Sequence, residues 1–131
     1  MEELSEEMPS AEAPAITYRR HLERGKLAYQ RCAECSEAVF YPRVLCPLCG
    51  SGALKWRESA GRGTVYATTA LHGRNRDPRN VVLVDLDEGF RMMSRVEGLP
   101  AGEVEIGARV RFEVRRGEED EPVAVFVREE S

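Results

Sequence analysis

The sequence predicts a mainly β protein with one N-terminal helix, a small cysteine-rich ribbon and a five-stranded barrel. Two observations carry this prediction. All four cysteines fall into two Cys-x-x-Cys pairs, Cys32 with Cys35 and Cys46 with Cys49. After Gly61, short alternating apolar and polar stretches follow one another between turn residues, as β-strands do. The 131 residues suffice for one domain or for two very small units that share an interface.

Composition argues against several classes of protein. Hydrophobic residues make up 42% and charged residues 32%, so neither general disorder nor a coiled coil is expected. No apolar run approaches the roughly 20 residues that span a bilayer. The acidic first seven residues lack the apolar stretch of a secretory signal. We therefore expect a cytoplasmic protein without membrane contact, whose paired cysteines bind a metal instead of forming disulfides.

The charge balance argues against a nucleic-acid partner. The chain has 23 acidic and 19 basic residues, a net charge of −4. Phosphate neutralisation supplies most of the affinity of a nucleic-acid binder, which therefore usually has a basic excess.

The N-terminal part divides into a tail and a helix. Residues 1–16 are acidic and have no apolar period, so they are expected to form a flexible tail. Residues 17–30 are expected to hold a helix and a lead-in strand, with Thr17 capping a helix over 18–27. Gly25 weakens this helix near its end.

Residues 31–60 are expected to form the ribbon. Short strands are predicted at 28–32, 39–42 and 54–58, around the two Cys-x-x-Cys turns. The nearby aromatic residues Phe40, Tyr41 and Trp56 are expected to form its small core.

Residues 61–131 are expected to form the barrel. Alternation or an apolar run predicts five strands, at 63–71, 81–87, 90–97, 109–115 and 123–127. One longer connector, residues 99–106, lies between the third and fourth strands. This number and placement of strands fit a Greek-key barrel of the OB-fold type.

The cysteine spacing predicts one structural zinc ion. Two thiolates separated by two residues reach one ion from a single turn, and a second such turn completes a tetrahedron. Cys32, Cys35, Cys46 and Cys49 therefore form a rubredoxin-like zinc ribbon. Iron in a redox role is the alternative, but no second redox group is evident. Four thiolates leave no open coordination position, which indicates a structural and not a catalytic metal.

No catalytic group is predicted in this chain. His21 and His72 are not at ligand spacing from the cysteines, and both are expected to be exposed or hydrogen-bonded. No Ser/His/Asp arrangement, fifth cysteine or phosphate-binding glycine loop is present.

Three arginines, Arg74, Arg76 and Arg79, gather after the first barrel strand. Two interpretations stay open for them. They belong to a solvated loop, or their guanidinium groups contact a phosphate-bearing ligand such as CoA or an acidic partner surface.

Taken together, these motifs resemble the DUF35-type zinc-ribbon OB-fold proteins over residues 18–127. The resemblance rests on Leu27-x-x-Gln30-Arg31-Cys32-x-x-Cys35, Tyr41-Pro42-Arg43-x-x-Cys46-Pro47-x-Cys49-Gly50, Gly61-Arg62-Gly63-Thr64-Val65-Tyr66, Val84-Asp85-Leu86-Asp87-Glu88-Gly89 and Ile106-Gly107-x-x-Val110.

The resemblance implies a function that composition could not. Members of this family are typically small partners of thiolase-like enzymes in acyl-CoA chemistry, and some are fused or bound to hydratase-type proteins. We therefore expect a non-catalytic accessory subunit that forms a hetero-oligomer with a thiolase-like acyltransferase or aldolase and supports its CoA site. Whether CoA contacts this chain stays open. The alternatives are a single-stranded nucleic-acid-binding module and an iron-loaded electron carrier.

Overall fold

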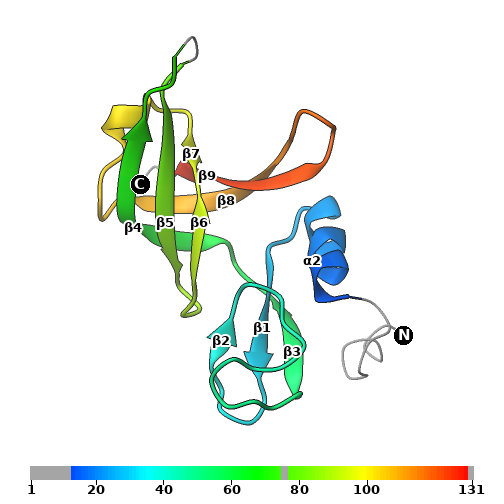
Figure 1. The fold of residues 1–131 in the computed structure, drawn as a ribbon. Coiled ribbons are helices and arrows are strands. Elements are labelled where there is room, and N and C mark those ends of the chain that lie inside the picture. The colour runs from blue at the N-terminus through cyan, green and yellow to red at the C-terminus, as the bar shows by residue number, and fades with distance from the viewer. Residues whose placement is uncertain (1–12, 75–76, 130–131) are drawn as a thin grey trace.

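The computed structural model of the chain describes residues 13–74 and 77–129 (Figure 1). Within these residues one α-helix precedes a three-stranded sheet and a six-stranded sheet, so the predicted mainly β class is confirmed. Residues 1–12 of the predicted tail lie outside the described part. The elements are α2 (Pro14–Glu23), β1 (Ala28–Cys32), β2 (Ala38–Val39), β3 (Leu54–Glu58), β4 (Arg62–Leu71), β5 (Arg79–Leu86), β6 (Arg91–Ser94), β7 (Val96–Glu97), the 3-10 helix η1 (Ala101–Glu103), β8 (Arg109–Arg116) and β9 (Pro122–Arg128).

The predicted bounds of the helix were wrong at both ends. The helix begins at Pro14, which suits the first turn because its φ is fixed and its missing N–H is not needed there. It ends before Gly25, whose φ of +78° turns the chain away. The Gly25 N–H donates to Leu22 O at 2.8 Å, and the Lys26 N–H donates to His21 O at 2.9 Å. Gly25 therefore terminates the helix and does not merely weaken it.

The ribbon sheet has the strand order β2-β1-β3, and both pairings are antiparallel. β1 is the central strand and ends at Cys32, which lies opposite Leu54 of β3. A small cluster of Cys32, Val39 and Cys46, with Cys35 and Leu54 beside it, is buried within the ribbon itself. The first Cys-x-x-Cys turn therefore starts directly from β1, whereas the second lies in the loop between β2 and β3.

The barrel sheet has the strand order β6-β5-β4-β8-β9-β7. The single strand predicted at 90–97 is divided at Arg95, because β6 pairs with β5 whereas β7 pairs with β9 in parallel. Chain bending at this point brings the two ends of the sheet together as an OB-type barrel. A bulge between Val65 and Ala67 shifts the register of β4, and Tyr66 there is 52% exposed.

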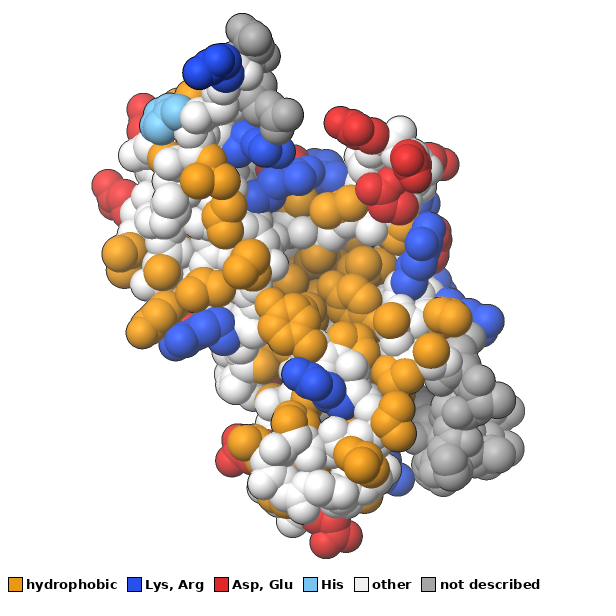
Figure 2. Space-filling view, in the orientation of Figure 1, with side chains coloured by type: hydrophobic (Ala, Val, Ile, Leu, Met, Phe, Trp, Pro, Cys, Tyr) orange, Lys and Arg blue, Asp and Glu red, His pale blue; other side chains and the backbone are white. Residues whose placement is uncertain are grey.

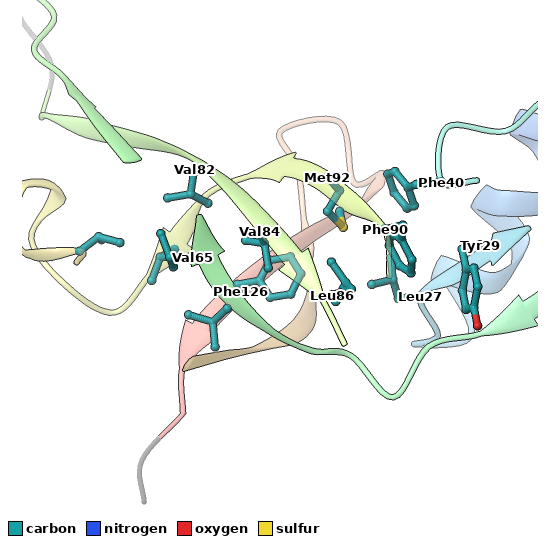
Figure 3. Close-up of a cluster of buried hydrophobic side chains, with 13 residues drawn as sticks. Leu27, Tyr29, Phe40, Val65, Val82, Val84, Leu86, Phe90, Met92 and Phe126 are labelled. Atoms are coloured by element: carbon teal, nitrogen blue, oxygen red, sulfur yellow. The ribbon is translucent and has the colours of Figure 1, made fainter. Parts of the chain in front are cut away.

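The ribbon and the barrel share one hydrophobic core. Leu27, Tyr29 and Phe40 belong to the same buried cluster as the barrel residues (Figure 3). Phe90 of the barrel stacks on both aromatic rings, with centroid distances of 4.7 Å to Tyr29 and 5.2 Å to Phe40. Stacked pairs of this kind contribute beyond the area that they bury.

None of the three aromatic residues predicted for a ribbon core belongs to the cluster buried within the ribbon. Phe40 faces the barrel, and Tyr41 is 52% exposed. Trp56 stacks on the ring of His21, 5.8 Å away between centroids. The sulfur-containing cluster takes the place of that predicted core.

Polar contacts also fix the junction between the ribbon and the barrel. Glu88 lies in the turn between β5 and β6, and its carboxylate accepts hydrogen bonds from the Ser59 hydroxyl and the Ala60 N–H, both at 2.7 Å. Its carbonyl accepts one from the Arg31 guanidinium at 3.1 Å. The turn of the barrel is thereby tied to the ribbon and to the segment that follows it.

Candidate metal centre

The four cysteine sulfurs converge at the far end of the ribbon sheet. All four Sγ atoms lie within 4.8 Å of one another. The Cys32 and Cys49 sulfurs are 3.6 Å apart, and those of Cys35 and Cys46 are 3.8 Å apart. Four thiolates at about 2.3 Å from a zinc ion form a tetrahedron with edges of about 3.8 Å. The donor set and its spacing therefore fit one structural zinc.

The two Cys-x-x-Cys turns have the same backbone hydrogen bonds. The N–H four residues after the first cysteine donates to that cysteine's carbonyl at 2.8 Å, from Ser36 to Cys32 and from Gly50 to Cys46. Both donors have positive φ, 67° for Ser36 and 82° for Gly50. In each turn the first cysteine then donates to the residue five positions on, Cys32 to Glu37 at 3.0 Å and Cys46 to Ser51 at 2.8 Å.

Backbone donors also point at the sulfurs. The Cys35 N–H lies 3.5 Å from the Cys32 sulfur, and the Leu48 N–H lies 3.4 Å from the Cys46 sulfur. Hydrogen bonds of this kind favour the charged thiolate. The turns therefore supply geometry and electrostatic support for an anion.

The pKa values of the thiols diverge because they share one site. The Cys35 N–H lowers the pKa of Cys32 to about 7. The Ser51 N–H lowers the pKa of Cys49, but the hydrogen bond with Cys32, desolvation and the other sulfurs outweigh it and raise that pKa to about 12. One thiolate forms readily and opposes the ionisation of the next, so four thiolates require a cation at the centre.

Gln30 holds the loop between the two turns. Its side chain is only 3% exposed. Its amide donates to Arg43 O at 3.0 Å, and its oxygen accepts the Arg43 N–H at 2.8 Å. The side chain thus replaces a strand partner for this loop. Gln30 was named from the sequence only as part of a family motif and was given no role. Ser36 was not singled out, and its one signal in the sequence is that it occupies the same place in its turn as Gly50.

The arginines predicted for ligand or partner contact lie apart from the cysteines. Arg74 and Arg79 border the β4–β5 loop, at the end of the barrel away from the ribbon (Figure 1). Both are exposed. Arg76 lies outside the described residues. The histidines are also apart from the metal centre: His21 Nδ1 is 3.0 Å from Thr17 O, and His72 is exposed.

Zinc affinity is expected to fall as the pH falls, because protons compete for the same thiolates. If the turns are formed before the metal binds, Cys32 is already ionised above pH 7 and three thiols lose protons on binding. The logarithm of the dissociation constant then changes by about three per pH unit near pH 8 and by about four below pH 6. Competition with a chromophoric chelator measures this slope. Four thiols of an unordered chain, each with the ordinary pKa near 8.5, would release only about one proton per ion at pH 9. A slope that falls to about one there would show that the turns form only with the metal, because the formed turns raise the pKa values of Cys35 and Cys49.

Substitutions at Ser36 and Gly50 are expected to have opposite effects. Ser36→Gly relieves a left-handed conformation and raises the free energy of unfolding by about 1 kcal/mol. Gly50→Ala lowers it by a similar amount, about 1 kcal/mol, through backbone strain. No atom lies within 4 Å of the added methyl group, so the cost is not a clash. Urea unfolding of the zinc-loaded variants measures both. Effects of equal size and the same sign would contradict the assignment of left-handed backbone to both positions.

Two family models match adjacent parts of the chain. A model described as the ChsH2 rubredoxin-like zinc ribbon domain matches residues 19–55, and one described as the ChsH2 C-terminal OB-fold domain matches residues 56–115. A solved chain titled Ltp2-ChsH2(DUF35) aldolase has 28% identity and a TM-score of 0.78, covering 92% of this chain and 98% of that one. A DUF35-family structure of unknown function from Sulfolobus solfataricus, at 16% identity, 76% coverage of each chain and a TM-score of 0.63, shows the same fold.

Two curated proteins match about three quarters of this chain in sequence. A DUF35 domain-containing scaffold protein of Methanocaldococcus jannaschii is 30% identical over 108 residues, 77% of each chain. A probable enoyl-CoA hydratase alpha subunit of Thermomonospora curvata is 32% identical over 105 residues, 77% of this chain. The aligned part covers only 33% of that longer relative. With its zinc ribbon, its OB-fold barrel and these relatives, the chain belongs to the DUF35 family.

Proposed function

We propose that this chain is a non-catalytic accessory subunit of a thiolase-superfamily enzyme that acts on acyl-CoA thioesters. Its role is to help assemble the enzyme and to shape the CoA and substrate site. The observation that carries the proposal is the match over nearly the whole length of a chain titled as part of an aldolase with Ltp2. The name of the hydratase relative supports an acyl-CoA setting.

The chemistry is assigned to the partner because this chain's candidate nucleophiles are already engaged. We propose that Cys32, Cys35, Cys46 and Cys49 bind one structural zinc, which leaves no sulfur for covalent catalysis. His21 is held by Thr17 and Trp56. Reduced thiols also suit the cytoplasm, where we place the complex.

The second cysteine turn supplies a docking surface. Val44, Leu45 and Leu48 are 72%, 56% and 66% exposed. We call these three residues the turn patch. Large aliphatic side chains this exposed usually mark a protein-binding surface, and the metal centre beside them holds their loop in place. In the proposed complex the turn patch contacts the thiolase-like partner.

The β4–β5 loop supplies a basic surface. Arg74 and Arg79 are exposed and form no ion pair within the described residues. Their guanidinium groups are suited to a phosphate or carboxylate. We propose that they, together with Arg76, face the CoA phosphates or an acidic surface of the partner.

Nucleic-acid binding by the barrel is the weaker candidate. The arginines of β8 pair with neighbouring carboxylates: Arg109 with Asp87 at 2.8 Å, Arg111 with Glu113 at 2.9 Å, and Arg115 with both Glu113 and Glu97. The hydrogen bond from Arg109 holds the pKa of Asp87 below its usual value, as in a stable ion pair. Little positive charge is left on this face for phosphates.

Co-purification tests the proposal. The chain is expressed with the thiolase-superfamily protein of the same organism, and the mass of the complex is measured by light scattering. Changing the turn patch with Val44→Asp and Leu48→Asp is expected to weaken the complex by about 100-fold, because charges replace buried aliphatic contacts.

Ile106→Asp is the matched control, since Ile106 is 69% exposed on the barrel and outside the turn patch. It is expected to leave the complex intact. Absence of any complex with the unaltered chain, or full stability and activity of the enzyme without it, would reject the proposed function.

A further inference from the structure

The barrel is open on one side, between β6 and β9. β6 pairs with β5, and β9 pairs with β7 only at Phe126 and Val127. The junction closes where the Phe126 N–H donates to Arg95 O at 3.0 Å. A hydrogen bond from the Ser94 hydroxyl of β6 to Ala124 O of β9, at 3.0 Å, still joins the strands, and beyond it β6 and the start of β9 diverge (Figure 1).

Backbone groups of β6 face this opening. The hydrogen bond from Leu86 N to Phe90 O sets the alternation, so that Met92 bonds to β5 whereas Arg91 and Met93 point away from it. The Met93 N–H donates to the Tyr41 hydroxyl at 3.3 Å. The Met93 and Arg91 carbonyls have no strand partner within the described part of the chain.

On the other side of the opening, the backbone groups of Ala124 in β9 have no strand partner for hydrogen bonding within the described residues. The Ala124 carbonyl accepts the Ser94 hydroxyl at 3.0 Å. Because the Phe126 N–H points away from β8, alternation along β9 also turns the Ala124 N–H away from β8 and into the opening. Residues 77–129 offer this N–H no strand partner. Both borders of the opening therefore have backbone groups that a further strand can use.

The opening leads into an apolar hollow. Figure 2 shows hydrophobic side chains gathered in a hollow between the barrel, the β8–β9 turn and the ribbon. Tyr41 and Met93 at the β6 border are 52% and 58% exposed. A groove of about 680 Å³ lies at the β9 end, lined by Arg95, Arg116, Val123 and the turn. We call this hollow, with its two borders, the β6–β9 groove.

The charge at the β9 end is acidic. Residues 118–121 are all Glu or Asp. The nearby arginines are already paired, Arg95 with Glu97 at 2.7 Å and Arg116 with Glu23 at 3.3 Å. Glu118 and Glu119 have no cationic partner among the residues that the structure describes. Residues 1–12 contain five glutamates and no Lys or Arg, so their charge does not complement this end.

We infer that the β6–β9 groove binds an extended segment of the partner protein. Its backbone pairs with the β6 edge, its apolar side chains enter the hollow, and a basic side chain at its end contacts Glu118 and Glu119. The inference rests on the proposed function for the existence of a partner, but the groove belongs to this chain and is tested without one.

Two synthetic peptides test the inference by NMR titration of the isotopically labelled, zinc-loaded full chain. The first alternates Val and Thr over six residues and ends in Lys-Arg. The second is identical except for a central proline, which cannot donate a strand hydrogen bond. The first peptide is expected to shift the amides of β6 and β9 and to slow hydrogen exchange at Ala124 or at Met93. The proline peptide is expected to bind at least tenfold more weakly.

Charge variants separate specific binding from general attraction. Glu118→Lys with Glu119→Lys is expected to weaken binding of the first peptide by about tenfold. Glu103→Lys with Glu105→Lys makes the same change of charge at exposed positions near η1, and is expected to leave binding unchanged.

Three results would overturn the inference. They are equal binding of both peptides, amide shifts outside β6, β9 and their turn, and self-association of the chain through the groove without peptide. The last would assign the groove to a second copy. None of these results depends on the enzyme partner, so failure here is distinct from failure of the proposed function.

Discussion

The convergence of four sulfurs at one end of the ribbon is the constraint on which the rest of the structure depends. The ribbon buries only a small cluster of its own, in which two of the three fully buried members are cysteines. So few apolar contacts cannot hold about 30 residues together without a metal or disulfides. The metal centre fixes β1 and β2, and these strands place Tyr29 and Phe40 on the barrel. The metal centre therefore stabilises the aromatic stack around Phe90 through β1 and β2.

This arrangement gives the molecule two surfaces in a fixed relation. The turn patch lies on the ribbon, whereas the β6–β9 groove lies where the barrel meets the ribbon. Tyr41 links them, since it follows the ribbon residue Phe40 and accepts a hydrogen bond from β6. Glu88 ties the barrel turn to the ribbon from the other side. A partner that contacts both surfaces therefore meets one rigid unit, which reduces the entropy lost on binding.

Much of the fold followed from local patterns in the sequence. The cysteine spacing predicted the ribbon, and β1 and β3 have their predicted bounds because alternation and turn residues specify them locally. The start of α2 was missed because Pro14 was included in the acidic tail, although proline suits a first helical turn. The direction of Phe40 and the division of the third barrel strand at Arg95 depend on distant partners, which no local pattern contains. Of the predicted site residues, the cysteines come together, and the role of the arginines stays a prediction.

Hydrogen exchange with and without zinc tests the central claim most directly. If the metal centre orders the ribbon and, through it, the aromatic stack, chelation will speed exchange of amides in β1 to β3 and at the β5–β6 turn. Amides of β4 and β8, which the barrel holds by itself, will stay protected. Unchanged protection of the ribbon in metal-free protein, verified by elemental analysis, would contradict the account.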